Sequence, residues 1–218
     1  MNHDGLLSLD VMRGRTIAAM TLVNNPAVWG KAYAPLQHAF WHGMTPTDLI
    51  YPFFVFIMGV SAWFSLSSRC KGPDSGVSRH IVRRSAVIFA LGLLLQEISY
   101  FGYGTANYLS GAVAEGTTWA EAVFPWRTFR ILGVLQGLAL AYLLGALLLV
   151  RLRFRHMTLA AAVLLLVYLA VLQWGNGYAL SADNIIARVD RAVLGEAHLY
   201  REWLPDGSRL AFEPEGLL

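Results

Sequence analysis

Residues 36–59 read LQHAFWHGMTPTDLIYPFFVFIMG, a stretch in which two histidines, a tryptophan and an aspartate come immediately before a long apolar run. An apolar run of about 18 or more residues is typical of a transmembrane helix. The stretch therefore predicts that titratable side chains lie at the mouth of a membrane-spanning helix. We expect any chemistry of the chain to occur there.

The composition of the whole chain is that of a membrane protein. Of its 218 residues, 56% are apolar and 14% are charged, against roughly 25% charged in an ordinary soluble domain. We predict an all-α fold, a polytopic transmembrane helix bundle of about five spans that forms a single membrane domain over 1–218. The first span is the least apolar. The predicted spans, followed by an outer segment, are 10–29, 49–67, 85–101, 131–150, 157–174 and 175–218.

The distribution of Lys and Arg predicts the orientation of the chain. With the N-terminus inside, the inner segments carry ten of the seventeen basic residues and three acids, whereas the outer segments carry seven bases and eleven acids. The excess of positive charge on one side places the N-terminus in the cytoplasm. His38 and Asp48 then lie outside, and Cys70, the single cysteine, lies on an inner loop. No basic surface with interleaved aromatics indicates a nucleic-acid partner; the expected partner is the lipid bilayer.

Polar residues recur on one face of the first predicted helix. Residues at spacings of three and four share a helix face, and here these are Asp10, Arg13, Ile17, Met20 and Asn24. Such a stripe does not face lipid comfortably. One interpretation is an ion pair at the inner border with an asparagine that only joins helices. The other is a functional pathway, and the residues alone leave both open.

Local sequence gives Asp48 and His38 different interpretations. Thr45 has the features of an N-cap, with Pro46 at the first helical position and Asp48 reaching back as in a capping box. Asp48 can therefore be structural. His38 precedes the helix and is free to act as a base or nucleophile, or simply to bind backbone. A metal pair with His42 is a weak hypothesis because no third ligand is near, and we predict no metal.

A GxxxG pattern opens the fourth predicted span. Gly133 and Gly137 let two helices approach closely, which predicts a helix-contact face and permits a homodimer. Gln136 lies between them and is a candidate for a polar group lining a cavity.

Ordered motifs over nearly the whole chain carry a family resemblance. They are Leu7–Asp10 with Arg13–Gly14, Val23–Asn24, His38–Ala39 with Trp41 and Gly43, Thr45 with Asp48, Pro52–Phe53 with Ile57–Gly59, Gly133–Gln136, Asp190–Arg191, Leu194–Gly195, His198–Tyr200 and Pro214–Gly216. In this order they resemble the heparan-α-glucosaminide N-acetyltransferase family and its bacterial relatives. Several motifs in one order are far more specific than any one of them.

The resemblance implies a membrane enzyme that takes acetyl from acetyl-CoA on the cytoplasmic side. It delivers the acetyl group to the amine of a glucosamine-type sugar on the other side. The active-site histidine of the family falls on His38, its asparagine on Asn24 and its loop aspartate on Asp48. His38 then acts as an acetyl-carrying nucleophile or as the base that takes the amine proton, with Asn24 holding the thioester carbonyl. Sequence does not choose between these two routes.

Further candidates complete the predicted site, and the expected location is the bacterial inner membrane. Candidates for binding the sugar acceptor are Trp41, His42, Arg130, Asp190, Arg191 and His198. Candidates for binding acetyl-CoA are Asp10 and Arg13. Two other functions stay open: an amino-sugar or small-solute transporter that uses the polar stripe, and a non-enzymatic assembly subunit that uses the glycine faces.

Several positions depart from the family pattern. Leu132 stands where proline is common, Gly137 where arginine is common and Arg15 where an apolar residue is usual. The second departure puts an anion-binding role at that position in doubt. The chain also ends at Leu218, where the relatives continue from Pro-Glu-Gly into further spans, so we expect an N-terminal portion of a larger, multi-pass protein.

Overall fold

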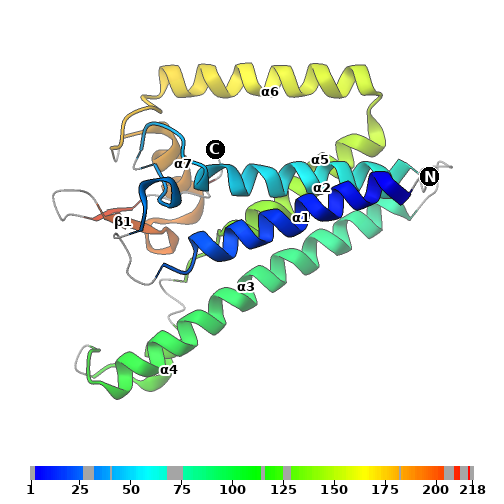
Figure 1. Cartoon of the computed structure of the whole chain (residues 1–218). Helices are drawn as coiled ribbons and strands as arrows, with labels where there is room; N and C mark the ends of the chain where they lie inside the picture. Colours follow the sequence, from blue (N-terminus) through cyan, green and yellow to red (C-terminus); the bar gives the residue numbers. More distant parts are fainter. Residues whose placement is uncertain are drawn as a thin grey trace. The chain divides into compact units, whose positions relative to one another are not determined.

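The computed structural model of the chain is predominantly helical (Figure 1). It describes residues 3–26, 32–39, 41–67, 76–113, 116–124, 129–181, 183–203, 209–211 and 216. The helices and strands are α1 His3–Val23, η1 Ala34–Leu36, η2 Thr47–Leu49, α2 Ile50–Ser67, α3 Val77–Leu109, α4 Trp119–Val123, α5 Val134–Arg151, α6 Phe154–Trp174, α7 Ile185–Leu194, η3 Glu196–His198, β1 Arg201–Trp203 and β2 Arg209–Ala211. The predicted all-α membrane fold is confirmed.

The predicted outer segment 175–218 has more structure than the sequence indicated. It contains α7 and η3, and β1 pairs antiparallel with β2, with Glu202 opposite Leu210. Three-residue strands are shorter than the alternating pattern that identifies a strand in a sequence. Charged residues surround these strands, which is why composition alone predicted a solvated loop.

Four helices of the described chain are long and apolar enough to cross a membrane, against about five predicted spans. They are Thr47–Ser67, which joins η2 to α2, and α3, α5 and α6. The predicted span 10–29 is not among them. Its helix, α1, begins earlier and ends at Val23, and every 18-residue stretch of it contains Asp10, Arg13 and Arg15.

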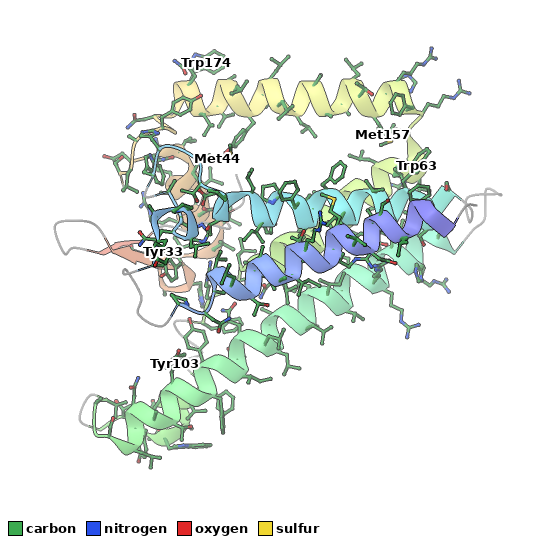
Figure 2. All side chains as sticks on the ribbon, viewed as in Figure 1. Tyr33, Met44, Trp63, Tyr103, Met157 and Trp174 are labelled. Atoms are coloured by element: carbon green, nitrogen blue, oxygen red, sulfur yellow. The ribbon has the colours of Figure 1, made fainter. Side chains whose placement is uncertain are left out.

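The third predicted span, 85–101, is part of a much longer helix. With 33 residues, α3 is about 50 Å long at 1.5 Å per residue, and the hydrocarbon core of a bilayer is only about 30 Å thick. It therefore reaches into the polar region on at least one side or lies tilted. Apolar side chains remain exposed along the spanning helices, as Figure 2 illustrates for Trp63 on α2 and Trp174 at the end of α6.

The chain divides into two compact units, Met1–Val77 and Ser78–Leu218. In the first unit, α1 packs against α2 (Figure 1). The guanidinium of Arg13 donates a hydrogen bond to Ser61 Oγ at 3.3 Å and so ties the two helices together. The helix ends before Asn25–Pro26, as predicted, because proline disfavours helical conformation in the residue before it. The prediction of a single membrane domain stays a prediction.

In the second unit, α5 packs closely against α3. A Cβ atom added at Gly92 of α3 would lie 2.8 Å from Cβ of Leu135, so only glycine permits this approach. Ser85 Oγ donates to the carbonyl of Ala139 at 2.8 Å. Gln136, predicted as a cavity-lining group, is 2% exposed and has its amide nitrogen buried. The first turn of α5, which begins after Gly133, is therefore a helix-contact surface.

Candidate active site

The start of the second helix positions the carboxylate of Asp48. The backbone N–H of Thr45 donates to Asp48 Oδ2 at 2.8 Å, which is the reach back to the helix start that the sequence predicted. The predicted Thr45 N-cap is displaced by one residue. Pro46 is the N-cap, and the first turn is the 3₁₀ helix η2. The hydroxyl of Thr45 instead donates to the carbonyl of Gln37 at 2.7 Å and lies 3.0 Å from Asp48 Oδ2.

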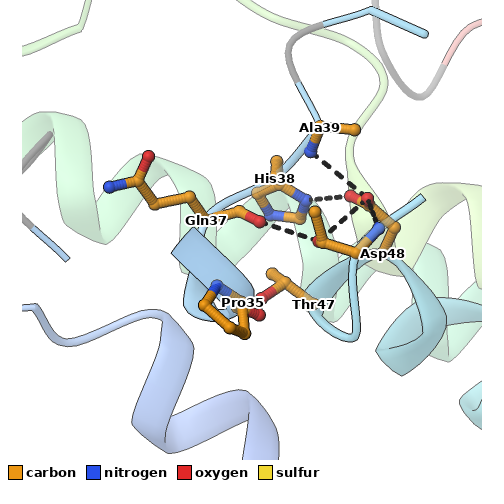
Figure 3. A network of polar contacts seen from close by, with 7 residues as sticks. Pro35, Gln37, His38, Ala39, Thr47 and Asp48 are labelled. Carbon is orange, nitrogen blue, oxygen red and sulfur yellow. Dashed lines mark hydrogen bonds and ion pairs between the residues drawn. The ribbon is translucent and has the colours of Figure 1, made fainter. Parts of the chain in front are cut away.

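His38 lies against this carboxylate (Figure 3). Its Nδ1 is 2.7 Å from Asp48 Oδ1, and the backbone N–H of Ala39 donates to Oδ2 at 3.2 Å. The side chain of His38 is 71% exposed, whereas that of Asp48 is 26% exposed. The aspartate is thus held within the loop while the imidazole stands toward the outside. The structure brings together these two of the three predicted catalytic residues.

Backbone carbonyls clamp the loop that carries His38 to the helix start. Thr47, which is 3% exposed, donates its hydroxyl to the carbonyl of Pro35 at 3.1 Å. The side-chain amide of Gln37 donates to the carbonyl of Ala32. With the bond from Thr45 to Gln37, these contacts fix residues 35–38 on the N-terminal turn (Figure 3). The orientation of the imidazole is therefore set before any ligand binds.

The geometry decides which imidazole nitrogen is available. Asp48 accepts hydrogen bonds from Thr45 and Ala39 as well as from His38, so its carboxylate is the acceptor of the short contact. The proton of that contact then lies on Nδ1 of His38, and the neutral imidazole carries its lone pair on Nε2. A carboxylate that orients and stabilises imidazole in this way makes Nε2 a competent base or nucleophile.

The other candidates of the first unit have different surroundings. Asn24 follows α1 and is exposed, and no hydrogen bond joins it to His38 or Asp48 in the described part of the chain. Trp41 is half-buried and stands edge-on to His42, with ring centroids 6.4 Å apart. These two rings lie in the same loop as His38. No three His, Cys, Asp or Glu side chains gather as metal ligands among the described residues.

The two acetyl-CoA candidates form an ion pair on α1. Arg13 Nη1 lies 2.7 Å from Asp10 Oδ1, and both side chains are partly exposed. The second Nη of Arg13 contacts Ser61. The pair that the sequence suggested is confirmed, and its contact with α2 was missed because a serine in an apolar run indicates only close helix packing.

In the second unit, two of the predicted sugar-binding residues, Arg130 and His198, lie at the segment that precedes α5. His198 Nδ1 lies 2.6 Å from the carbonyl of Phe129, and the guanidinium of Arg130 lies 5.1 Å from the ring centre of Tyr200. Gln96 of α3 donates to the carbonyl of Arg130 at 2.6 Å. Arg130 and His198 are thus brought together. Gln96 was missed because a glutamine near the end of the predicted span 85–101 has no specific sequence signature, whereas in the structure it lies inside α3.

Asp190 and Arg191 lie next to each other on α7, at different depths. Asp190 is fully buried, and a Cβ atom added at Gly216 would lie 2.2 Å from its Oδ2. Only glycine fits at position 216, which explains why the Pro214–Gly216 motif ends in glycine. Arg191 is half-buried near the end of the helix. Substrate contacts of both residues stay predictions.

Comparison with known proteins identifies what the chain is similar to. A family profile described as "Heparan-alpha-glucosaminide N-acetyltransferase, catalytic" matches residues 6–185. Heparan-alpha-glucosaminide N-acetyltransferase of Mus musculus is 31% identical over 145 residues, and that of Homo sapiens is 32% identical over 145 residues. Each alignment covers 66% of this chain but 19% of the relative, so the matched part is about a fifth of the length of these proteins.

Proposed function

Because this chain belongs to the heparan-alpha-glucosaminide N-acetyltransferase catalytic family, we propose that it carries the histidine of an acetyl-CoA-dependent membrane acetyltransferase. The acceptor is the amine of a glucosamine-type sugar, as the names of its relatives suggest. The single observation that carries the proposal is the 2.7 Å contact between His38 Nδ1 and Asp48 Oδ1. It supports His38 Nε2 as the reacting atom.

Two reaction routes use the same nitrogen. In direct transfer, the sugar amine attacks the thioester carbonyl and Nε2 of His38 takes the amine proton. CoA leaves as thiolate, which then receives that proton from His38. In a relay, Nε2 attacks the carbonyl and CoA leaves. The amine then attacks the acetyl-imidazole, the bond from the acetyl carbon to Nε2 breaks, and the amine proton passes by way of Nε2 to the CoA thiolate. Asp48 stabilises the positive imidazole in both routes. Asn24 is our candidate donor to the thioester oxygen.

The order of the candidate spans along the chain supports a sugar-binding site on the side of the membrane where His38 lies. The helix Thr47–Ser67 starts next to His38, and α3, α5 and α6 follow as three further candidate spans. After four crossings the segment 175–218 returns to the side of His38. The basic loops lie on the opposite side, which the positive-inside rule assigns to the cytoplasm. We propose a multi-pass location in a bacterial inner membrane.

We assign the contacts to the sugar and the contacts to acetyl-CoA to different residues. We propose that Trp41 and His42 of the first unit contact the sugar. The candidate sugar contacts of the second unit are Arg130, Asp190, Arg191 and His198. We propose that Asp10 and Arg13 of α1 contact acetyl-CoA. Because Arg13 is already paired with Asp10 at 2.7 Å, it offers its remaining N–H groups rather than an unbalanced charge. The homodimer stays a prediction of the sequence, because the first turn of α5 contacts α3 of the same chain.

Acetyl transfer in membranes tests the proposal. Membranes that contain the protein are incubated with radiolabelled acetyl-CoA and glucosamine, and labelled sugar is counted. We expect His38→Ala to lower the rate roughly 100- to 10,000-fold, the usual contribution of a general base. His156→Ala, at an exposed histidine of α6, is the matched control and keeps the wild-type rate.

Each alternative function predicts another outcome of the same assay. Equal rates for His38→Ala and the wild type contradict the catalytic role of His38. Uptake of sugar into vesicles without acetylation supports a transporter instead. If a folded protein gives neither, an assembly subunit is supported, and loss of oligomers in Gly133→Leu is its positive test.

A further inference from the structure

A groove of about 300 Å³ lies between α1 and the start of α2, within the first compact unit. Five of its seven lining residues are apolar, among them Ala19, Ile50 and Phe53. Arg15 is its only charged residue. The groove is therefore an apolar channel with a single cation, a composition that fits a ligand with one anionic group and an apolar chain.

The charge of Arg15 is not balanced within the described part of the chain. No hydrogen bond or ion pair of its guanidinium is found there, whereas the neighbouring Arg13 is held by Asp10 at 2.7 Å and by Ser61 at 3.3 Å. The hydroxyl of Thr16, the other polar side chain of the groove, already donates to the carbonyl of Met12 at 2.8 Å. Arg15 is thus the polar group of the groove that remains for a ligand.

Arg15 is exposed on α1, next to a candidate membrane span. It lies on a helix that packs along α2, and α2 is part of a candidate membrane span. A cation in apolar surroundings is retained where an anion compensates for its lost hydration.

We propose that this groove binds one anionic phospholipid. The phosphate contacts the guanidinium of Arg15, whose planar donors match phosphate oxygens, and an acyl chain lies along Ala19, Ile50 and Phe53. Charge complementarity favours this ligand over acetyl-CoA, which carries several phosphate charges and a polar linker. The groove has one cation and an apolar wall, and the bilayer around α2 supplies the lipid.

Lipid titration by native mass spectrometry tests the site on the purified full chain in detergent. The probes are phosphatidylglycerol and a diacylglycerol with the same acyl chains and no phosphate. We expect phosphatidylglycerol to bind at least tenfold more tightly than diacylglycerol. Arg15→Gln weakens its binding about tenfold, which corresponds to about 1.4 kcal/mol. Ala19→Phe keeps the charge but fills the groove, and it also weakens binding.

The matched control is Arg155→Gln, which removes an equal charge from an exposed position on α6. We expect it to bind phosphatidylglycerol like the wild type. Equal losses in Arg15→Gln and Arg155→Gln would indicate non-specific attraction and overturn the proposal. So would undiminished binding in Ala19→Phe, or displacement of the lipid by acetyl-CoA. If Arg15→Gln does not fold, Ala19→Phe and Arg15→Lys decide, the latter being expected to retain most of the binding.

Discussion

At the scale of single residues, the two carboxylate oxygens of Asp48 have different hydrogen-bond partners. Oδ2 accepts from the N–H groups of Thr45 and Ala39, which fix the loop, and Oδ1 faces Nδ1 of His38. The loop donors and the imidazole therefore depend on the same side chain. The geometry therefore fits the structural interpretation of Asp48, and its proposed catalytic role uses the other oxygen of the same carboxylate.

Asp48→Asn separates the role of this side chain in holding the loop from its role in orienting His38. The amide oxygen is drawn to the donors now on Oδ2, so its NH₂ group faces His38 Nδ1, which must then accept. The proton moves to Nε2 and removes the lone pair that reacts. We expect acetyl transfer to fall roughly 100- to 10,000-fold, with an unchanged circular dichroism spectrum. Asp183→Asn, at an exposed aspartate, serves as control, and full activity of Asp48→Asn would contradict the orientation role.

Thr47 tests the clamp beneath His38. Thr47→Val keeps the shape of the side chain but removes the donor to the carbonyl of Pro35, a bond of 3.1 Å in a buried place. An acceptor left without its partner costs about 1–3 kcal/mol. We expect a lower thermal unfolding midpoint and slower transfer. Thr158→Val removes an exposed hydroxyl that only bonds within α6, and an equal loss there would argue against the clamp.

At the scale of helices, Gly92 sets the approach of α3 to α5. In Gly92→Ala the added Cβ would lie 2.8 Å from Cβ of Leu135, so one helix must shift. Overpacking of this kind costs about 1–3 kcal/mol. Gly145→Ala adds the same atom on α5 with no neighbour within 4 Å and gains helix propensity. We expect unfolding at lower temperature for the first variant only, and equal midpoints would refute this packing.

The same scale shows how much of the structure the sequence predicts. Long apolar runs identify the four spanning helices because a membrane demands many consecutive apolar residues. The ends of α1 cannot be predicted in this way because charged residues interrupt its apolar sequence. The strand pair β1–β2 cannot be predicted either, because each strand is too short to show an alternating pattern. At the site, His38 and Asp48 are predictable as residue types. Their clamp is not, because the carbonyls of Pro35 and Gln37 that accept from threonines have no sequence signature.

At the scale of the whole molecule, the proposed orientation in the membrane can be tested by labelling the single cysteine. Cys70, which lies outside the described residues, belongs to the basic loop between α2 and α3 and is expected in the cytoplasm. We expect a membrane-impermeant maleimide to label it in inside-out vesicles but not in right-side-out vesicles.

The opposite pattern is expected for Ser110→Cys in a chain whose Cys70 is replaced by serine. Ser110 follows the end of α3, one crossing later. Labelling of both positions from the same side would contradict a membrane crossing by α3 and, with it, the alternation that places His38 outside.

His38 and Asp48 are ten positions apart in the sequence, and the hydrogen bonds that fix them join residues 32–48. Closing so short a loop costs little chain entropy, and contacts between near neighbours in a sequence form quickly. His38 is therefore oriented by contacts within one continuous segment that precedes α3, α5 and α6 in the chain. These contacts join near neighbours in the sequence, so forming them requires no pairing of distant helices.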